Sequence, residues 1–166
     1  MVAAVVCAIA VSFAQPAEAE LRPTPREGAA HAVPLYGELV RTWDAPDDDP
    51  YAPGHRGLDV AAPEGSAVRA SASGTVSFAG SVAGNLAVTI DHGDALWTTY
   101  SFLREIAVAK GQRVEGGTVV GGVGTGHANA TAGPHVHLSA RRDGLYFDPI
   151  GLYLGSDYSA LLALTR

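Results

Sequence analysis

The stretch Leu86-Ala87-Val88-Thr89-Ile90-Asp91 alternates large apolar residues with smaller or polar ones. Successive side chains of a strand point to opposite faces, so this period of two predicts a β-strand with one face in a core. Short apolar runs recur on both sides of it, separated by Gly, Pro and Asn and with no helical period between them. Runs at such close spacing predict an antiparallel, all-β domain. Further strand candidates are Thr75–Phe78, Leu96–Phe102, Arg113–Val114, Thr118–Val120 and His135–Ala140.

Composition excludes several classes of protein. The 166-residue chain carries 17 acidic and 11 basic residues, a net charge of −6. Binding to a phosphate backbone requires a basic surface, so we expect no nucleic-acid partner. The length predicts one domain that buries a core without needing a disulfide. Cys7 is the only cysteine and lies in the predicted leader described next, which excludes a cysteine nucleophile and a Cys-ligated zinc finger.

The first 19 residues have the features of a secretory signal peptide. Val2 to Ala14 are apolar except for Ser12, and Ala17-Glu18-Ala19 provides a small-residue cleavage site. Thirteen apolar residues are fewer than the roughly 18–20 that span a bilayer. We therefore expect export to the cell envelope or beyond, with no stable membrane insertion after cleavage.

The rest of the chain divides by composition into three parts. Residues 20–50 are rich in Pro, Ala and acidic residues and are expected to form an irregular N-terminal arm, in which His31 is solvated. Residues 51–153 carry the strand pattern and form the predicted β domain. Residues 154–166 form a tail, with one turn of helix predicted over Tyr158–Leu164.

Two histidine motifs carry the candidate chemistry. His55-Arg-Gly-Leu-Asp59 places an imidazole and a carboxylate four residues apart, around a Gly that permits a sharp turn. Gly133-Pro-His135-Val-His137 places two imidazoles on one face of a strand, because alternate residues share a face. Two adjacent imidazoles are a poor core element, since each ring nitrogen needs a partner. They are explained if one binds a metal and the other handles a proton.

Further motifs stand between and around these two: Val60-Ala-Ala-Pro-Glu-Gly65, Gly74-Thr-Val76, Asp91-His-Gly93, Lys110-Gly-Gln-Arg-Val114, Thr125-Gly126 and Asp148-Pro149. Together, from about Pro53 to Ile150, they resemble the lysostaphin-type, or LytM-like, zinc peptidases. The resemblance implies an exported peptidoglycan hydrolase with a β-sheet core and an open substrate groove over one sheet face. Its expected partners are peptidoglycan peptides, and we expect a monomer.

The resemblance also implies roles for individual residues. His55, Asp59 and His137 correspond to the ligands of Zn²⁺, and His135 to the residue that acts on water at the metal. Three His or Asp ligands with a fourth position left to water are what a catalytic zinc requires. His92 is expected to hold a turn or a hydrogen bond rather than to act in catalysis. For Arg56, contact with a peptide carboxylate and a plain surface charge both remain open.

One position departs from the family pattern. The family has Tyr-x-His-Leu where this chain has Tyr100-Ser101-Phe102-Leu103, and Phe102 forms no hydrogen bond through its side chain. Strand parity makes Tyr100 the first candidate for the missing donor, and His127, on a Gly-rich loop, is the second. The Thr98-Thr99-Tyr100 variant resembles a divergent secreted branch of the family. The alternative to an active enzyme is therefore a weak or inactive wall-binding module, or a hydrolase activator, that keeps the zinc site.

Overall fold

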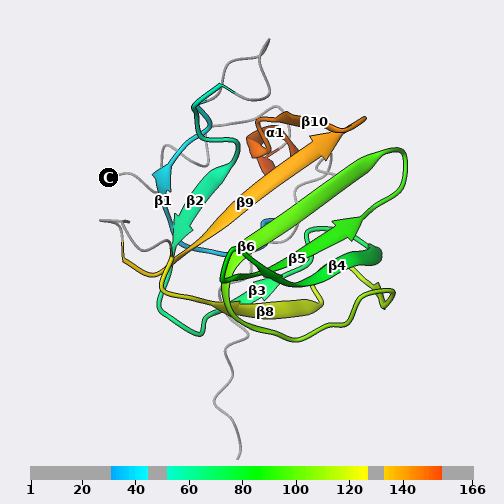
Figure 1. The fold of residues 1–166 in the computed structure, drawn as a ribbon, viewed down its shortest axis with the longest axis horizontal. Helices are drawn as coiled ribbons and strands as arrows, with labels where there is room; N and C mark the ends of the chain where they lie inside the picture. The colour runs from blue at the N-terminus through cyan, green and yellow to red at the C-terminus, as the bar shows by residue number, and fades with distance from the viewer. Residues whose placement is uncertain (1–30, 45–51, 127–132, 155–166) are drawn as a thin grey trace, which may run out of the picture.

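A computed structural model describes residues 31–44, 52–126 and 133–154, which contain ten strands and one helix (Figure 1). The strands pair antiparallel in the order β1-β2-β9-β6-β5-β4-β7, with β10 beside β9, and with β8 beside both β3 and β6. The prediction of an antiparallel all-β domain is thus confirmed. The elements are β1 (Glu38–Arg41), β2 (Leu58–Ala61), β3 (Ala67–Arg69), β4 (Gly74–Val82), β5 (Asn85–Asp91), β6 (Leu96–Ile106), β7 (Arg113–Val114), β8 (Val119–Val123), β9 (His135–Arg142), β10 (Leu145–Phe147) and α1 (Ile150–Leu154).

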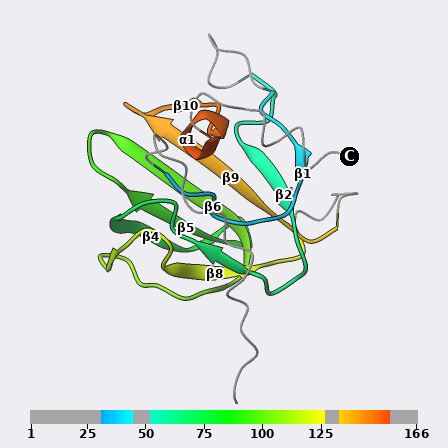
Figure 2. The same cartoon turned by 180° about the vertical axis from the view of Figure 1, so that it is seen from behind.

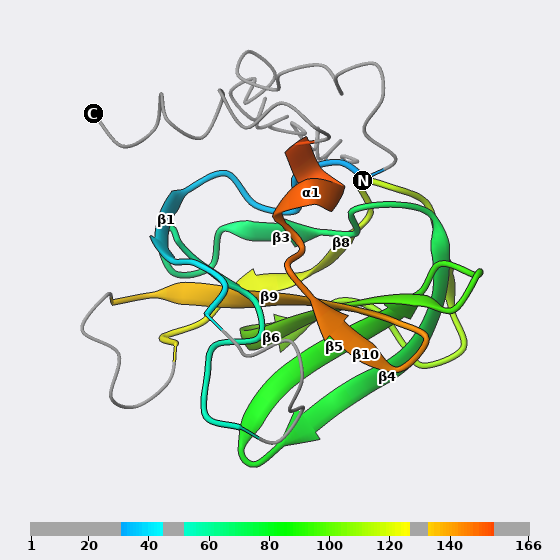
Figure 3. The same ribbon diagram turned by 90° about the horizontal axis from the view of Figure 1, so that it is seen from above.

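The two faces of the main sheet have different surroundings. Figure 2 looks onto the face crossed by α1 and β8, and Figure 3 shows α1, β3 and β8 stacked on that side. Val88 and Ile90 of β5 are fully buried in the core beneath them, where Tyr153 of α1 also packs. The alternate residues Ala87 and Thr89 line a groove on the opposite face. The period of two in β5 therefore separates core from groove.

Strand β6 changes partner along its length. Leu96 to Ser101 pair with β9, whereas Leu103 to Ile106 pair with β8. The residue between these halves, Phe102, has a φ of 64°, and β5 skips it, pairing Leu86 with Leu103 and Ala87 with Ser101. Phe102 is thus the extra residue of a β-bulge, which bends a strand and re-aims its side chains.

Part of the N-terminal arm, which was expected to be irregular, forms a strand. Its residues Glu38–Arg41 form β1, which pairs with β2 and covers what would otherwise be the edge of the sheet. His31 is buried rather than solvated, because its Nδ1 bonds to the Ser71 hydroxyl at 3.0 Å. The expected signal peptide, residues 1–19, and the helical turn over Tyr158–Leu164 lie outside the described residues. Across the described ranges, no helix is long and apolar enough to cross a membrane.

Candidate metal centre

Three side chains converge at one end of the groove. Asp59 in β2 and His137 in β9 are register partners, so their side chains lie on the same face of the sheet. His55 precedes β2, where its backbone forms an isolated bridge with Asp44. His55 Nε2 lies 3.0 Å from Asp59 Oδ1 and 3.1 Å from His137 Nδ1, and the last two atoms are 2.8 Å apart. These residues form the cluster, in the described part of the chain, that can hold a metal ion.

The protonation of this cluster favours a cation at its centre. His55 Nδ1 donates to the Thr42 carbonyl oxygen at 2.6 Å, so in a neutral ring Nε2 carries a lone pair. That lone pair faces a carboxylate oxygen, and two acceptors at this distance repel each other unless a proton or cation lies between them. A tetrahedral zinc with bonds of about 2.0–2.1 Å separates its ligand atoms by roughly 3.3 Å. The observed triangle of ligand atoms fits zinc after a small expansion.

The Asp59 carboxyl is held in its ionised form. Burial alone raises its pKa, but hydrogen bonding to His137 and the charges of His137 and His55 outweigh burial and bring the pKa to about 2. A metal ligand must be deprotonated, and Asp59 meets that condition at neutral pH.

Gly57 serves a purpose that the sequence interpretation missed. It has no positive φ, so it is not needed for a left-handed turn. A Cβ at this position would lie 2.6 Å from Cε1 and 2.7 Å from Nε2 of His137. Gly57 therefore allows the backbone to press against the imidazole and restrict its orientation.

His135 lies on the same face of β9 as His137, two residues away. It is buried, and its Nδ1 donates to the Gly133 carbonyl oxygen at 2.8 Å. This bond leaves Nε2 as the basic nitrogen of the neutral ring. A Cβ on Gly126 would collide with the imidazole, so backbone packs directly on the ring. His135 is thus fixed in position and tautomer without belonging to the three-residue cluster.

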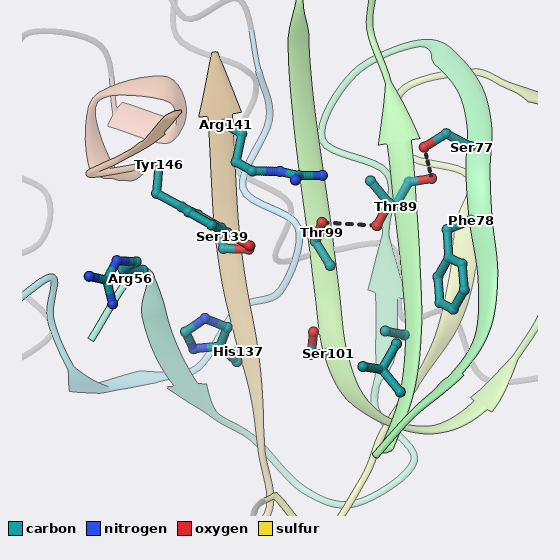
Figure 4. Close-up of a pocket in the computed structure, with 12 residues that line it drawn as sticks. Arg56, Ser77, Phe78, Thr89, Thr99, Ser101, His137, Ser139, Arg141 and Tyr146 are labelled. Carbon is teal, nitrogen blue, oxygen red and sulfur yellow. Dashed lines mark hydrogen bonds between the residues drawn. The ribbon is translucent and has the colours of Figure 1, made fainter. Parts of the chain in front are cut away.

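The groove extends from His137 across the strands of the open face, with a volume of about 690 Å³ (Figure 4). Hydroxyl side chains cover much of its floor, and Thr89 and Thr99 bond to each other across it at 3.0 Å. The groove is lined by Arg56, Ser77, Phe78, Val82, Ala87, Thr89, Thr99, Ser101, His137, Ser139, Arg141 and Tyr146. An extended chain lying on this face would reach the metal-ligand cluster at one end.

The sequence profile of peptidase family M23 matches residues 53–149, more than half of the chain. The chain belongs to peptidase family M23. This confirms the lysostaphin-type family that the motifs indicated.

This chain spans only about a quarter of the length of the first curated relative that it matches. DD-carboxypeptidase/endopeptidase Mpg of Neisseria meningitidis is 41% identical over 101 residues, which are 60% of this chain and 23% of the relative's length. The structure of a zinc-containing peptidase from Vibrio cholerae is 25% identical, with a TM-score of 0.59, over 73% of this chain and 38% of that one. Lysostaphin from Staphylococcus simulans shares the fold at 19% identity and a TM-score of 0.64, over 80% of this chain and 58% of that one.

The structure places Tyr100 away from the M23 metal cluster, contrary to the parity argument. Tyr100 is fully buried on the core face, where its hydroxyl donates to Ser71 Oγ and accepts from the Ser71 N–H. The prediction from strand parity was wrong because the β-bulge turns the Phe102 side chain to the face opposite that of Tyr100. The Phe102 ring centroid lies 5.8 Å from that of His135 and 6.4 Å from that of His137. The second candidate donor, His127, lies outside the described residues.

Sequence reasoning missed one support of the M23 site and one structural feature on the opposite side of the sheet. The Thr42 carbonyl, which orients His55, comes from the arm and carries no side-chain signature. A polar network of His31, Ser71, Thr98, Tyr100 and the half-buried His92 occupies the core side of the sheet. His92 bonds there to the Ser73 carbonyl and to Thr98, in the hydrogen-bonding role expected of it.

Proposed function

We propose that this chain is an exported zinc metalloendopeptidase that hydrolyses peptide bonds in peptidoglycan stem or cross-bridge peptides. The observation that carries the proposal is the triangle of ligand atoms 2.8–3.1 Å apart at the end of an open groove. The Neisseria relative, named a DD-carboxypeptidase/endopeptidase, supports peptide-bond hydrolysis. The zinc-containing Vibrio peptidase supports the choice of metal.

His55, Asp59 and His137 would hold the zinc. When bound, zinc polarises a peptide carbonyl and lowers the pKa of a coordinated water from 15.7 toward about 7. His135 would accept the proton of the attacking water at Nε2 and pass it to the departing amine. Its Nδ1 bond to Gly133 keeps Nε2 basic through this cycle.

The direct test is incubation of the zinc-loaded protein with purified peptidoglycan, followed by mass analysis of the released peptides. Cleavage by the wild type and none by the ligand variant His137→Ala is the expected result. If the zinc-bound protein releases no soluble products from any peptidoglycan tested, the proposal of peptidase activity is contradicted.

A second candidate function is a wall-binding module or hydrolase activator that keeps the zinc site. Phe102 favours it, because an apolar ring stands beside His135 where the family pattern has a histidine. Losing one transition-state donor typically costs 10²–10³ in rate. Zinc-dependent sedimentation with peptidoglycan without cleavage, together with cleavage by Phe102→His, would support this candidate.

A further inference from the structure

The groove is cationic although the chain is acidic. The chain has 17 acidic and 11 basic residues, yet the groove lining, taken over the residues that the structure describes, contains two arginines and no aspartate or glutamate. The two cations are Arg56 and Arg141. In the view of Figure 4, Arg141 lies above Ser139 and Arg56 lies below it. A cleft lined by one sign of charge concentrates ligands of the opposite sign. The groove lining is therefore suited to an anionic peptide.

The guanidinium of Arg141 is positioned to bind such an anion. Its Cζ lies 5.5 Å from the centre of the Tyr146 ring, and the two residues are register partners in β9 and β10. Stacking on an aromatic face leaves the guanidinium N–H groups free to bind a carboxylate through two parallel bonds. Among the described residues, Arg141 forms no ion pair with an aspartate or glutamate. Figure 4 shows its side chain reaching from β9 toward β6 over the groove.

The position of Arg141 sets its distance from the reaction. His137, Ser139 and Arg141 alternate along β9 and so share the groove face. Four residues of strand span roughly 13 Å, and an extended peptide advances about 3.3 Å per residue. For a substrate that lies along β9, and allowing for the length of the arginine side chain, the guanidinium would meet a substrate group roughly two to four residues from the scissile bond.

We propose that Arg141, braced by Tyr146, binds a free carboxylate of the substrate and directs the protein to acidic stem peptides rather than to amidated or neutral bridge peptides. This inference rests on the proposed function and adds a specificity determinant to it. Arg141 acts here on substrate binding, and Tyr146 is a positioning residue that holds the guanidinium over the groove.

The test compares two synthetic stem peptides that differ only in one group, a carboxylate in the first and a carboxamide in the second. The wild type should cleave the carboxylate peptide with a kcat/KM roughly tenfold higher, as expected for a charge-assisted pair at a half-exposed site. Arg141→Gln should bring the ratio close to one, mainly by raising KM. Arg141→Lys keeps the positive charge but not the two parallel N–H donors, so it should retain part of the preference for the carboxylate peptide. Tyr146→Leu should reduce that preference.

Arg142→Gln is the matched control. Arg142 stacks on Phe147 as Arg141 stacks on Tyr146, with its Cζ 5.8 Å from the ring centre, but it lies outside the groove lining. Its substitution should leave the preference unchanged. A wild-type preference that survives in Arg141→Gln with unchanged KM would overturn the inference and leave the peptidase proposal intact.

Binding of the same two peptides, measured by calorimetry, separates the two proposals. If the wild type cleaves neither peptide, the enzyme proposal fails and binding decides the inference. Tighter binding of the carboxylate peptide that is lost in Arg141→Gln supports it. Equal binding of both peptides by the wild type contradicts it.

Discussion

Two pairs of histidines lie on opposite sides of one sheet, with nearly the same ring spacing and different partners. The ring centroids of His55 and His137 are 4.8 Å apart on the groove side, and those of His31 and His92 are 4.7 Å apart on the core side. The first pair shares the carboxylate of Asp59. The second pair bonds to hydroxyl and carbonyl groups, which satisfy neutral imidazoles.

The partners thus decide what a histidine pair can do. A shared carboxylate adds negative charge where two lone pairs converge, which suits a metal ion. Hydroxyl groups donate or accept as needed, so they leave His31 and His92 neutral. Burial lowers the pKa of both rings, and for His31 the neighbouring His92 and Arg142 lower it further, to about 4.

The largest expected effect comes from removing the shared carboxylate. Asp59→Ala should lose zinc and reduce peptide hydrolysis by about 10⁴-fold or more, because the ion and its Lewis acidity are lost together. Metal analysis and turnover on peptidoglycan measure both. Ser71→Ala, the matched change beside His31, should keep its zinc. A loss of zinc in Ser71→Ala would contradict the conclusion that only the pair of His55 and His137 takes part in metal binding.

A smaller effect is expected at His135. Its replacement by Ala should leave the zinc content unchanged and depress turnover by roughly 10²–10⁴, the usual contribution of an acid–base group. Loss of zinc in this variant would mean that His135, rather than His137, is the metal ligand.

Phe102→His should raise turnover by up to about 10²-fold, since it supplies a donor on the groove face. Histidine is among the residues that tolerate positive φ, so the bulge should persist. Steady-state kinetics measure the gain, with Phe102→Leu as the control that adds no donor. An unchanged rate in Phe102→His would show that the wild type does not lack this donor.

The histidine pair on the core side should make the free energy of unfolding fall as the pH drops below neutral. The pKa of His31 in the folded protein, about 4, lies below the ordinary 6.5, so the unfolded chain takes up a proton first as pH falls. The stability associated with neutral His31 is complete above pH 6.5 and is lost progressively toward pH 4, by roughly 2 kcal/mol at pH 5. Urea unfolding at pH 7 and pH 5 tests this, and His31→Gln should lose less stability over that interval.

The smallest effect is expected for Tyr100→Phe. This change leaves the buried Ser71 N–H without its acceptor and should lower the free energy of unfolding by about 1–2 kcal/mol. The kcat/KM should stay unchanged, because Tyr100 does not reach the groove. A hundredfold loss of activity without a loss of stability would return Tyr100 to the catalytic site.

Local patterns predicted those parts of the molecule whose physics is local. The alternation in β5 and the spacing of His135 and His137 follow from the period of a strand, which the sequence displays directly. The ligand set came from its resemblance to a family, and register pairing brings Asp59 and His137 together as that set requires.

Other features depend on contacts between distant segments. Parity misplaced Tyr100 because a single bulged residue, Phe102, reverses the faces of β6, and no residue pattern announces a bulge without Gly. His31 was expected in solvent because its partner, Ser71, lies 40 residues away. The strand β1 has no alternation of its own and forms by pairing with β2.

The matched family segment begins at residue 53, but the support of the candidate metal cluster begins earlier in the chain. The Thr42 carbonyl fixes the His55 ring, and β1 shields the backbone of the strand that carries Asp59. A fragment trimmed to residues 53–149 would expose the backbone N–H and C=O groups of β2 as an unpaired strand edge and would remove the acceptor of His55 Nδ1. For anyone dissecting this protein, the boundary suggested by sequence similarity would remove the support of the first residue of the candidate metal cluster.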